Sequence, residues 1–183
     1  MLQLVGLCGD IGAGKSTVAK IMREHGFQTS RFAAYIKDTA KLWGFTPEEI
    51  DGPLKEIPCE RMLGVTPRHV LRILGTEVGR NIHPDFWVNL WQLNTAMPIL
   101  ESAGSLVVDD VRFPNEVAAI HRLGGKVFKV MRPGTEVNMS NHASDTQVLD
   151  YDYIIANTGD SVALKAHVAE RLELVDTHLE TAP

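Results

Sequence analysis

The sequence reads Gly9-Asp10-Ile11-Gly12-Ala13-Gly14-Lys15-Ser16 close to its start. This stretch has the spacing G-x-x-x-x-G-K-S. It lies between the apolar run 2–8, which predicts a buried strand, and a helical pattern that begins at Lys15. Backbone N–H groups of a glycine-rich loop, aided by the positive end of the following helix, can surround a polyphosphate more closely than side chains can. The stretch therefore predicts a phosphate-binding loop (P-loop) in an α/β protein.

The chemistry of this loop predicts ATP and Mg²⁺ as its ligands. Lys15 would place a positive charge at the β- and γ-phosphates, and the Ser16 hydroxyl would ligate Mg²⁺. The predicted nucleotide-binding residues are Asp10, Ile11, Gly12, Ala13, Gly14, Lys15, Ser16 and Thr17. The alternative is a glycine-rich turn with a solvated lysine.

A P-loop is found in GTPases, ATPase motors and small-molecule kinases. The chain has no Asn followed by Lys, so the guanine-reading N-K-x-D motif is missing, and no D-x-x-G follows the second predicted strand. A length of 183 residues also leaves little room for the accessory domains of a motor. The sequence therefore favours a single-lobed kinase that phosphorylates a small acceptor, although this step rests on analogy between folds.

Apolar runs alternate with helical patterns along the whole chain. After the run 2–8, strands are predicted at 27–32, 106–108, 127–131 and 153–156. Helices are predicted to begin at Lys15, Pro47, Pro67, Phe86 and Pro114, and another helix closes the chain, with an apolar stripe from Leu164 to Leu179. Such alternation indicates a parallel sheet with helices on both faces.

One predicted helix stands out by its periodicity. It begins at Thr66-Pro67, where threonine can cap the helix and proline fits its first position. Val70, Leu74, Val78 and Ile82 then recur at a spacing of four. The pattern predicts an amphipathic helix that buries these four side chains.

Composition excludes several classes of protein. The formal net charge is −5, which argues against a protein that wraps nucleic-acid backbone. The longest uncharged run, 86–100, contains three amides and Pro98 and is too short to span a bilayer. Cys8 and Cys59 do not form a C-x-x-C pair, so we expect free thiols and a reducing compartment.

Two aspartates end the predicted strand 106–108. Adjacent strand residues face opposite sides, so only one of Asp109 and Asp110 can point toward a site beside the P-loop, and the spacing alone does not say which. The residues that follow read Val111-Arg112-Phe113-Pro114-Asn115-Glu116.

Here the sequence resembles the bacteriophage-type deoxynucleoside monophosphate kinases. Besides the P-loop, the matching stretches are Arg31-Phe32-Ala33 with Lys37, Thr66-Pro67-Arg68, Gly75-Thr76-Glu77 with Arg80, Trp87-Val88, 110–116, Arg132-Pro133-Gly134, 142–145, and Ile155 with Asn157 and Gly159. They occur in order along nearly the whole chain. The P-loop is generic, whereas the D-V-R-F-P-N-E block together with G-T-E-x-G-R is specific.

The resemblance implies the fold and the reaction. The fold would be a P-loop kinase three-layer sandwich with a five-stranded parallel sheet, one domain over 1–183, a helical acceptor-binding region at about 33–100 and a lid at about 132–147. The γ-phosphoryl group of ATP would pass to a deoxynucleoside 5′-monophosphate, with Mg²⁺ present. The protein would act in the cytoplasm, that of the host if it is phage-encoded, without binding nucleic acid or membranes.

The resemblance also implies roles for individual residues. Lys15, Asp110, Arg112 and Arg132 would be catalytic, with Ser16 and Asp110 at the metal. Asn157 and Gly159 would lie near the adenine of ATP. The acceptor would be bound by Phe32, Lys37, Arg68, Glu77, Arg80, Trp87 and Asn115.

Several of these residues have a plain alternative. Arg80 has the spacing of a surface ion pair with Glu77, and Arg68 and Lys37 could be solvated helix residues. Aromatic side chains in helices usually fill a core, so Phe32 and Trp87 are open to both roles, and the helix 86–91 could belong to the core or to a homodimer face. Turn chemistry explains Asn157 and Gly159 equally well.

The predicted lid is unusual in its charge. After Arg132 no Lys or Arg occurs until Lys165, whereas the stretch 133–164 contains five acidic residues. We therefore expect Arg112 and Arg132 to supply the transition-state charge, with His142 as a further lid contact. Two functional alternatives remain: a dephospho-coenzyme A kinase, whose acceptor is a ribose hydroxyl, and a non-catalytic ATP-dependent binding module.

Overall fold

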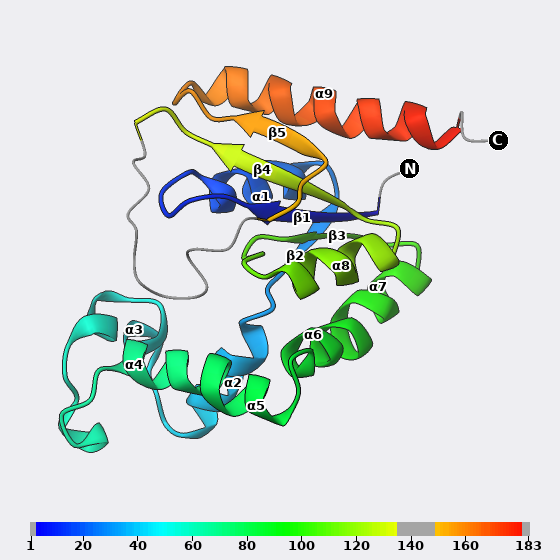
Figure 1. The fold of residues 1–183 in the computed structure, drawn as a ribbon. Helices are drawn as coiled ribbons and strands as arrows, with labels where there is room; N and C mark the ends of the chain where they lie inside the picture. Colours follow the sequence, from blue (N-terminus) through cyan, green and yellow to red (C-terminus); the bar gives the residue numbers. More distant parts are fainter. Residues whose placement is uncertain (1–2, 135–148, 181–183) are drawn as a thin grey trace. The chain divides into compact units, whose positions relative to one another are not determined.

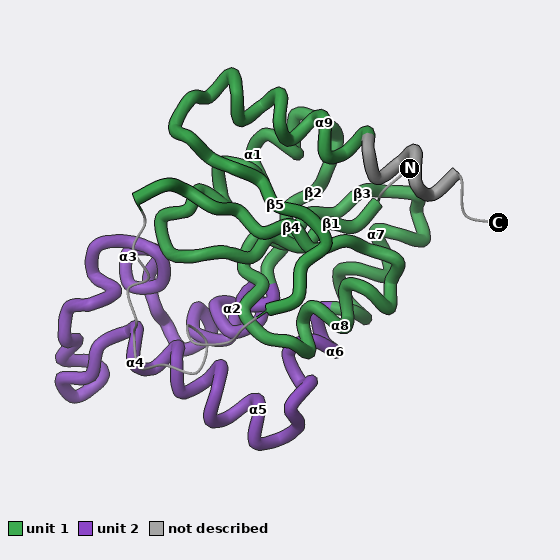
Figure 2. The backbone as a smooth tube through the Cα atoms, turned by 45° about the horizontal axis from the view of Figure 1, so that its top comes forward, with its two compact units in different colours: residues 1–31, 92–183 green, residues 32–91 purple. Residues whose placement is uncertain are grey.

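The structure is a computed structural model that describes residues 3–134 and 149–180, with side chains described to residue 173. The chain divides into two compact units (Figure 2). Unit 1 consists of Met1–Arg31 and Gln92–Pro183, and unit 2 of Phe32–Trp91. The stretch 135–148, which contains most of the predicted lid and His142, lies outside the described residues.

Unit 1 is built on a five-stranded parallel sheet (Figure 1). Its strands are β1 (Leu4–Cys8), β2 (Phe27–Ser30), β3 (Ser105–Val108), β4 (Lys126–Met131) and β5 (Tyr153–Ala156), in the order β2-β3-β1-β4-β5. All four pairings are parallel. The prediction of a parallel five-stranded α/β sheet is confirmed, and its order makes β1 the central strand.

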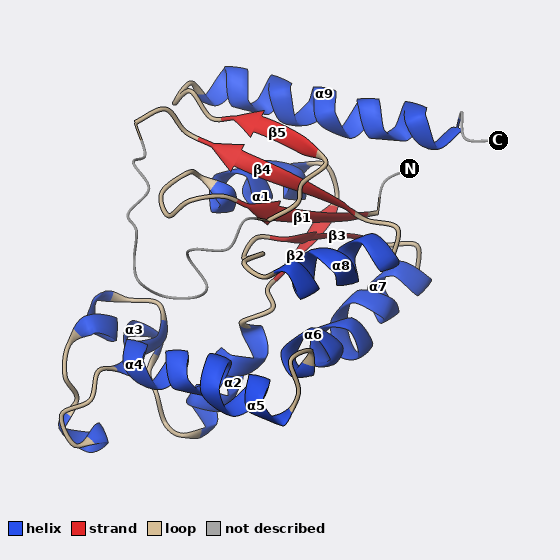
Figure 3. Ribbon diagram, in the orientation of Figure 1, coloured by secondary structure: helices blue, strands red, loops and turns tan. Residues whose placement is uncertain are grey.

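Helices cover both faces of this sheet (Figure 3). On one face α1 (Lys15–Glu24) packs beside α9 (Ser161–Glu180), and on the other lie α7 (Met97–Glu101) and α8 (Pro114–Arg122). Alternate residues of β1 point to opposite faces, so Val5 and Leu7 join the core under α1 and α9. On the opposite face Gly6 leaves room for Ile120 of α8.

Unit 2 is helical. It comprises α2 (Ala34–Leu42), α3 (Pro47–Ile50), η1 (Pro53–Glu56), η2 (Glu60–Met62), α4 (Pro67–Arg72), η3 (Ile73–Val78), α5 (Gly79–Ile82) and α6 (Phe86–Trp91). Here η1 and η2 are 3₁₀ turns, whereas η3 is a π-helical turn between α4 and α5. A second π-helical turn, η4 (Gln92–Ala96), links α6 to α7.

A buried carboxylate organises the first part of unit 2. Glu49 accepts hydrogen bonds from the backbone N–H of Thr46 at 2.8 Å, from Arg61 Nη2 at 2.6 Å and from the thiol of Cys59 at 3.5 Å. These bonds, with that of the Thr46 backbone foremost, lower the pKa of Glu49. Both cysteines of the chain are free thiols, as predicted.

The predicted burial pattern of the helix 67–82 is wrong in its second half. Leu74 is buried, but Val78 is 46% exposed and Ile82 is 65% exposed. The cause is η3, because a π turn takes in one residue more than an α turn and rotates everything after it. Gly79 therefore occupies the buried position that the spacing assigned to Val78.

The helix α6 is buried along one face. Its side chains Trp87, Val88 and Trp91 are almost fully covered, which makes them core residues. A homodimer stays a prediction. No helix in the described part of the chain has both the length and the apolar character to cross a membrane.

Candidate active site

The P-loop joins the carboxyl end of β1 to α1. Gly9, Gly12 and Gly14 have φ values of 132°, 82° and 100°, in the region that favours glycine. A Cβ atom on Gly9 would collide with the backbone carbonyl of Val130 in β4, and one on Gly14 with the side-chain amide of Asn157. The glycines are thus required both by the loop conformation and by close approaches, as expected of a backbone cradle for phosphate.

The side chain of Lys15 folds back over the P-loop. Its Nζ donates hydrogen bonds to the carbonyls of Gly9 at 2.6 Å and Asp10 at 2.9 Å. Burial lowers the pKa of Lys15, and the positive charge of Arg112 lowers it further. The carboxylates of Asp10 and Asp109 oppose this shift, so charges of both signs act on Lys15 at the P-loop.

A carboxylate holds the loop that carries Arg112. Glu116 is buried in the first turn of α8, and its Oε2 accepts the backbone N–H groups of Arg112 at 2.7 Å and Phe113 at 3.1 Å. Asn115, a predicted acceptor-binding residue, is half-buried in the same turn. Sequence reasoning missed the role of Glu116, although a Glu two residues after Pro114 has the spacing of a helix cap.

Asn157 supports the P-loop from β5. Its side chain is buried, and Nδ2 donates to the carbonyl of Ala13 at 2.9 Å while Oδ1 accepts the N–H of Gly159 at 3.2 Å. The backbone of Asn157 also donates to Met131 at 2.7 Å. Asn157 is therefore a positioning residue for the loop, and a contact with adenine stays a prediction. Arg132 is exposed directly after β4.

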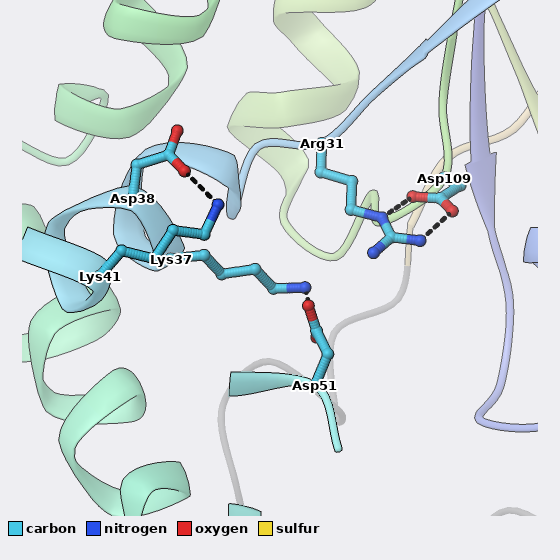
Figure 4. Close-up of polar contacts among 6 residues, drawn as sticks. All are labelled: Arg31, Lys37, Asp38, Lys41, Asp51 and Asp109. Atoms are coloured by element: carbon cyan, nitrogen blue, oxygen red, sulfur yellow. Dashed lines mark hydrogen bonds and ion pairs between the residues drawn. The ribbon is translucent and has the colours of Figure 1, made fainter. Parts of the chain in front are cut away.

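The two aspartates after β3 differ in environment. Asp109 is 7% exposed and accepts a double hydrogen bond from Arg31, with Nε–Oδ1 at 2.6 Å and Nη2–Oδ2 at 2.8 Å (Figure 4). Asp110, the predicted catalytic and metal-binding residue, is half-buried. Arg31 and Asp109 can pair because β2 and β3 are neighbours whose carboxyl ends meet at one edge of the sheet.

The predicted acceptor-binding cations of unit 2 all have partners. Lys37 Nζ lies 2.6 Å from Asp51 Oδ1 (Figure 4), and Arg68 Nη1 lies 2.8 Å from Glu56 Oε1. Arg80 Nη1 donates to the carbonyl of Pro84 at 3.2 Å. Glu77 is exposed on η3. Surface ion pairs contribute little to stability, and the binding of a substrate phosphate by Lys37, Arg68 and Arg80 stays a prediction.

The two predicted base-stacking residues are buried. The ring of Phe32 lies 4.5 Å from that of Trp91, and Trp87 donates from Nε1 to the carbonyl of Gly75 at 2.8 Å. Both side chains therefore pack inside unit 2, and stacking on a nucleobase stays a prediction.

The side chains at this end of the sheet fit a magnesium ion. Magnesium is commonly held by one or two carboxylates together with substrate phosphates rather than by an all-protein cage. Ser16 is exposed in the first turn of α1, and Asp110 lies two residues after β3, which is the neighbour of β1 in the sheet. No cluster of three His, Cys, Asp or Glu side chains occurs among the residues that the structure describes.

Comparisons of the sequence with known proteins found relatives of this chain. A family model described as deoxynucleotide monophosphate kinase matches residues 54–168. A putative deoxynucleotide monophosphate kinase of Acanthamoeba polyphaga mimivirus is 34% identical over 172 residues, which cover 84% of this chain and 88% of the relative. The deoxynucleotide monophosphate kinase of Enterobacteria phage T4 is 26% identical over 111 residues, 59% of this chain and 46% of the relative.

Two solved structures share the fold. The crystal structure of TT1252 from Thermus thermophilus has a TM-score of 0.55 and 17% identity, over 100% of this chain and 99% of that one. A dephospho-CoA kinase from Campylobacter jejuni has a TM-score of 0.51 and 17% identity, over 94% and 97% of the two chains. At such identity the likeness shows the fold alone.

Proposed function

The chain belongs to the deoxynucleotide monophosphate kinase family, and from this premise we propose that it phosphorylates a deoxynucleoside 5′-monophosphate with ATP. An oxygen of the acceptor's phosphate forms a bond to the γ-phosphorus of ATP, and the bond from that phosphorus to the β,γ-bridging oxygen breaks. The products are ADP and a deoxynucleoside diphosphate.

The observation that carries this proposal is the convergence of cations on the P-loop. Lys15 Nζ lies 2.6 Å from the carbonyl of Gly9 in the loop, and the charge of Arg112 acts on it in addition to burial, with Asp10 and Asp109 opposing. Phosphoryl transfer needs little covalent help from the protein, but it needs substrates held in line and charge stabilised on the group in transit. We assign Lys15 to the donor phosphates, and Arg112 and Arg132 to the transferring group.

The remaining residues position these groups. Asn157 fixes the P-loop through the carbonyl of Ala13, and Glu116 fixes the backbone at Arg112. Arg68, Arg80 and Lys37 in unit 2 would bind the acceptor. Ser16 and Asp110 would hold Mg²⁺, which supplies neutralising charge on the donor phosphates.

An acceptor screen tests the proposal. The purified protein with Mg-ATP is offered dAMP, dCMP, dGMP and dTMP in turn, then dephospho-coenzyme A, and ADP formation is followed. We expect ADP with at least one monophosphate, together with the matching diphosphate. ADP with dephospho-coenzyme A alone would establish the alternative kinase, and no acceptor-dependent ADP would leave only the non-catalytic binding module.

A further inference from the structure

Arg31 and Asp109 occupy equivalent positions at the ends of two neighbouring strands. Arg31 directly follows β2 and Asp109 directly follows β3, and the last pair in the register of these strands is Ser30 with Val108. The N–H of Asp109 also donates to the carbonyl of Ser30 at 3.3 Å, so the ladder continues by one residue. The sheet therefore places the two residues next to each other at its carboxyl edge, where ligands bind in open α/β folds.

The Asp109 carboxylate depends on Arg31 to balance its charge. The side chain of Asp109 is 5% exposed, whereas that of Arg31 is 41% exposed. The guanidinium donates from Nε and Nη2 to the two carboxylate oxygens at 2.6 and 2.8 Å, in the paired geometry that these groups favour (Figure 4). In the part of the chain that the structure describes, no other side chain bonds to this carboxylate. Removing Arg31 would therefore leave a buried negative charge without its partner, which is unfavourable.

The same carboxylate lies beside the P-loop. The strand β3 is a neighbour of β1, and after β3 the N–H of Val111 still donates to the carbonyl of Leu7 at 3.2 Å, just before the loop begins. Asp109 thus lies in a stretch that runs along the end of β1. Burial lowers the pKa of Lys15 most strongly, and the negative charge of Asp109 acts in the opposite direction. A carboxylate at this place attracts the ammonium group of Lys15 and would repel the phosphates of a nucleotide.

We propose that Arg31 is a positioning residue for the P-loop, which it serves through Asp109: the pair cancels the charge of the buried carboxylate and leaves the ammonium group of Lys15 to the phosphates of ATP. This inference rests on the proposed function, because it takes the P-loop to bind ATP, and it adds Arg31 and Asp109 to the site. Arg31 itself does not touch the nucleotide. Both oxygens of Asp109 accept from the guanidinium, so Mg²⁺ stays assigned to Ser16 and Asp110.

Three variants test the pair by the charge that each leaves behind. At saturating acceptor, we expect Arg31→Gln to raise the KM of ATP about tenfold, because the carboxylate that remains repels phosphates and attracts Lys15. Asp109→Asn removes a negative charge beside the P-loop and keeps the guanidinium, so the KM of ATP should fall about threefold. The double variant removes both charges, and its KM of ATP should return to within about twofold of the parent value.

A matched control and a stability measurement accompany these rates. Arg23→Gln removes an exposed arginine from the last turn of α1, away from the P-loop, and should change the KM of ATP by less than about twofold. Arg31→Gln should melt at a lower temperature than the double variant, because it alone leaves the buried carboxylate without a partner. If Arg31→Gln does not fold, the opposite sign expected for Asp109→Asn and the parent-like KM of the double variant still test the pair.

Binding without turnover separates this role from its alternatives. The non-hydrolysable analogue adenylyl imidodiphosphate is titrated calorimetrically without acceptor, with and without Mg²⁺, and its affinities should follow the order of the KM values in both conditions. A double variant as weak as Arg31→Gln would make Arg31 a direct nucleotide contact and overturn the proposal. A loss of affinity in Asp109→Asn confined to Mg²⁺ would make Asp109 a metal ligand and overturn it as well.

Two further outcomes separate the pair from the kinase assignment. Affinities for the analogue that stay equal in all three variants would reduce the pair to a structural contact, while the kinase assignment stands. If the parent protein forms no acceptor-dependent ADP but the analogue binds in the expected order, the kinase assignment fails and the role of Arg31 stands. If the parent protein does not bind the analogue, both fail.

Discussion

The P-loop of unit 1 and the arginine-bearing helix 67–82 of unit 2 differ in how we propose that they bind phosphate. The loop uses backbone N–H groups, so it needs glycine at fixed places, and those glycines appear in the sequence with their spacing. The helix uses guanidinium groups, whose positions depend on helical register. The π turn η3 changes that register, so that Gly79 takes the buried position in place of Val78. Sites made from backbone can therefore be found in a sequence more directly than sites displayed on helices.

The largest expected effect comes from removing a cation at the P-loop. Lys15→Ala should lower kcat/KM about 10³-fold, because a preorganised charge that we assign to the donor phosphates is lost. Initial rates of acceptor-dependent ADP formation measure this, and Lys20→Ala, an exposed lysine of the same helix, serves as the control. A loss of less than tenfold for Lys15→Ala would remove Lys15 from the catalytic assignment.

Single-turnover rates test the two arginines that we assign to the transferring group. Arg112→Ala and Arg132→Ala should each slow single-turnover phosphoryl transfer by about 10²-fold. If either variant keeps a single-turnover rate near that of the parent, that arginine has no part in stabilising the transition state.

An intermediate effect is expected at Gly79, where Trp87 packs against the arginine-bearing helix of unit 2. Gly79→Ala should destabilise the protein by about 1–3 kcal/mol, because the added Cβ meets the indole ring. The sign is informative, since Gly→Ala in an exposed helix normally stabilises by about 1 kcal/mol. Urea unfolding measures it, with Val78→Ala as the exposed neighbour that should change stability by less than about 0.5 kcal/mol. Equal or greater stability for Gly79→Ala would mean that the π turn is not held as described.

The smallest effect lies away from both regions, at the amino end of β5. Asp152 accepts hydrogen bonds from the N–H of Val127 at 2.8 Å, from His121 at 2.9 Å and from Lys126 at 3.1 Å. Burial alone would raise the pKa of Asp152, but these bonds outweigh it and lower the pKa below its ordinary value. The stabilisation is therefore present above the ordinary pKa and is lost as the pH falls through the lowered one.

Asp152→Asn should cost about 1 kcal/mol at neutral pH, and the difference from the parent should shrink in acid. Chemical unfolding at a series of pH values measures it, with the exposed Asp150→Asn as the control. Both KM values should stay at those of the parent. A stability difference that does not depend on pH, or a change in either KM, would contradict the assignment of Asp152 to sheet stability.

Local patterns predicted much of the fold. The five strands, the P-loop and most of the longer helices follow from apolar runs, glycine positions and Thr-Pro starts, whereas α2 was not predicted and the helical region between the second and third strands was implied by the family resemblance. The strand order could not be predicted, because it depends on which strands pair across the sheet. For that reason the Arg31–Asp109 contact, between residues 78 positions apart, was also missed.

Sequence reasoning predicted less of the site where one residue serves to position another. Asn157 matched a family pattern, but its bond to the carbonyl of Ala13 requires β5 to lie beside the P-loop. The exposure of Val78 and Ile82 contradicts the spacing-of-four pattern, because η3 is a π-helical turn, where Thr76 donates to the carbonyl of Arg72 and Trp87 to that of Gly75. One of these donors, Trp87, lies in α6, so the periodicity of the helix 67–82 cannot reveal it.

We propose that the P-loop, with its support from β5, binds ATP, and that residues of unit 2 bind the acceptor. The measurement that tests it most directly is the pair of KM values for ATP and for the acceptor in Asn157→Ala, with the exposed neighbour Thr158→Ala as the control. Loss of the buried bond to Ala13 should raise the KM of ATP about tenfold and leave that of the acceptor within twofold. Equal increases in both values, or an unchanged KM for ATP, would contradict the claim.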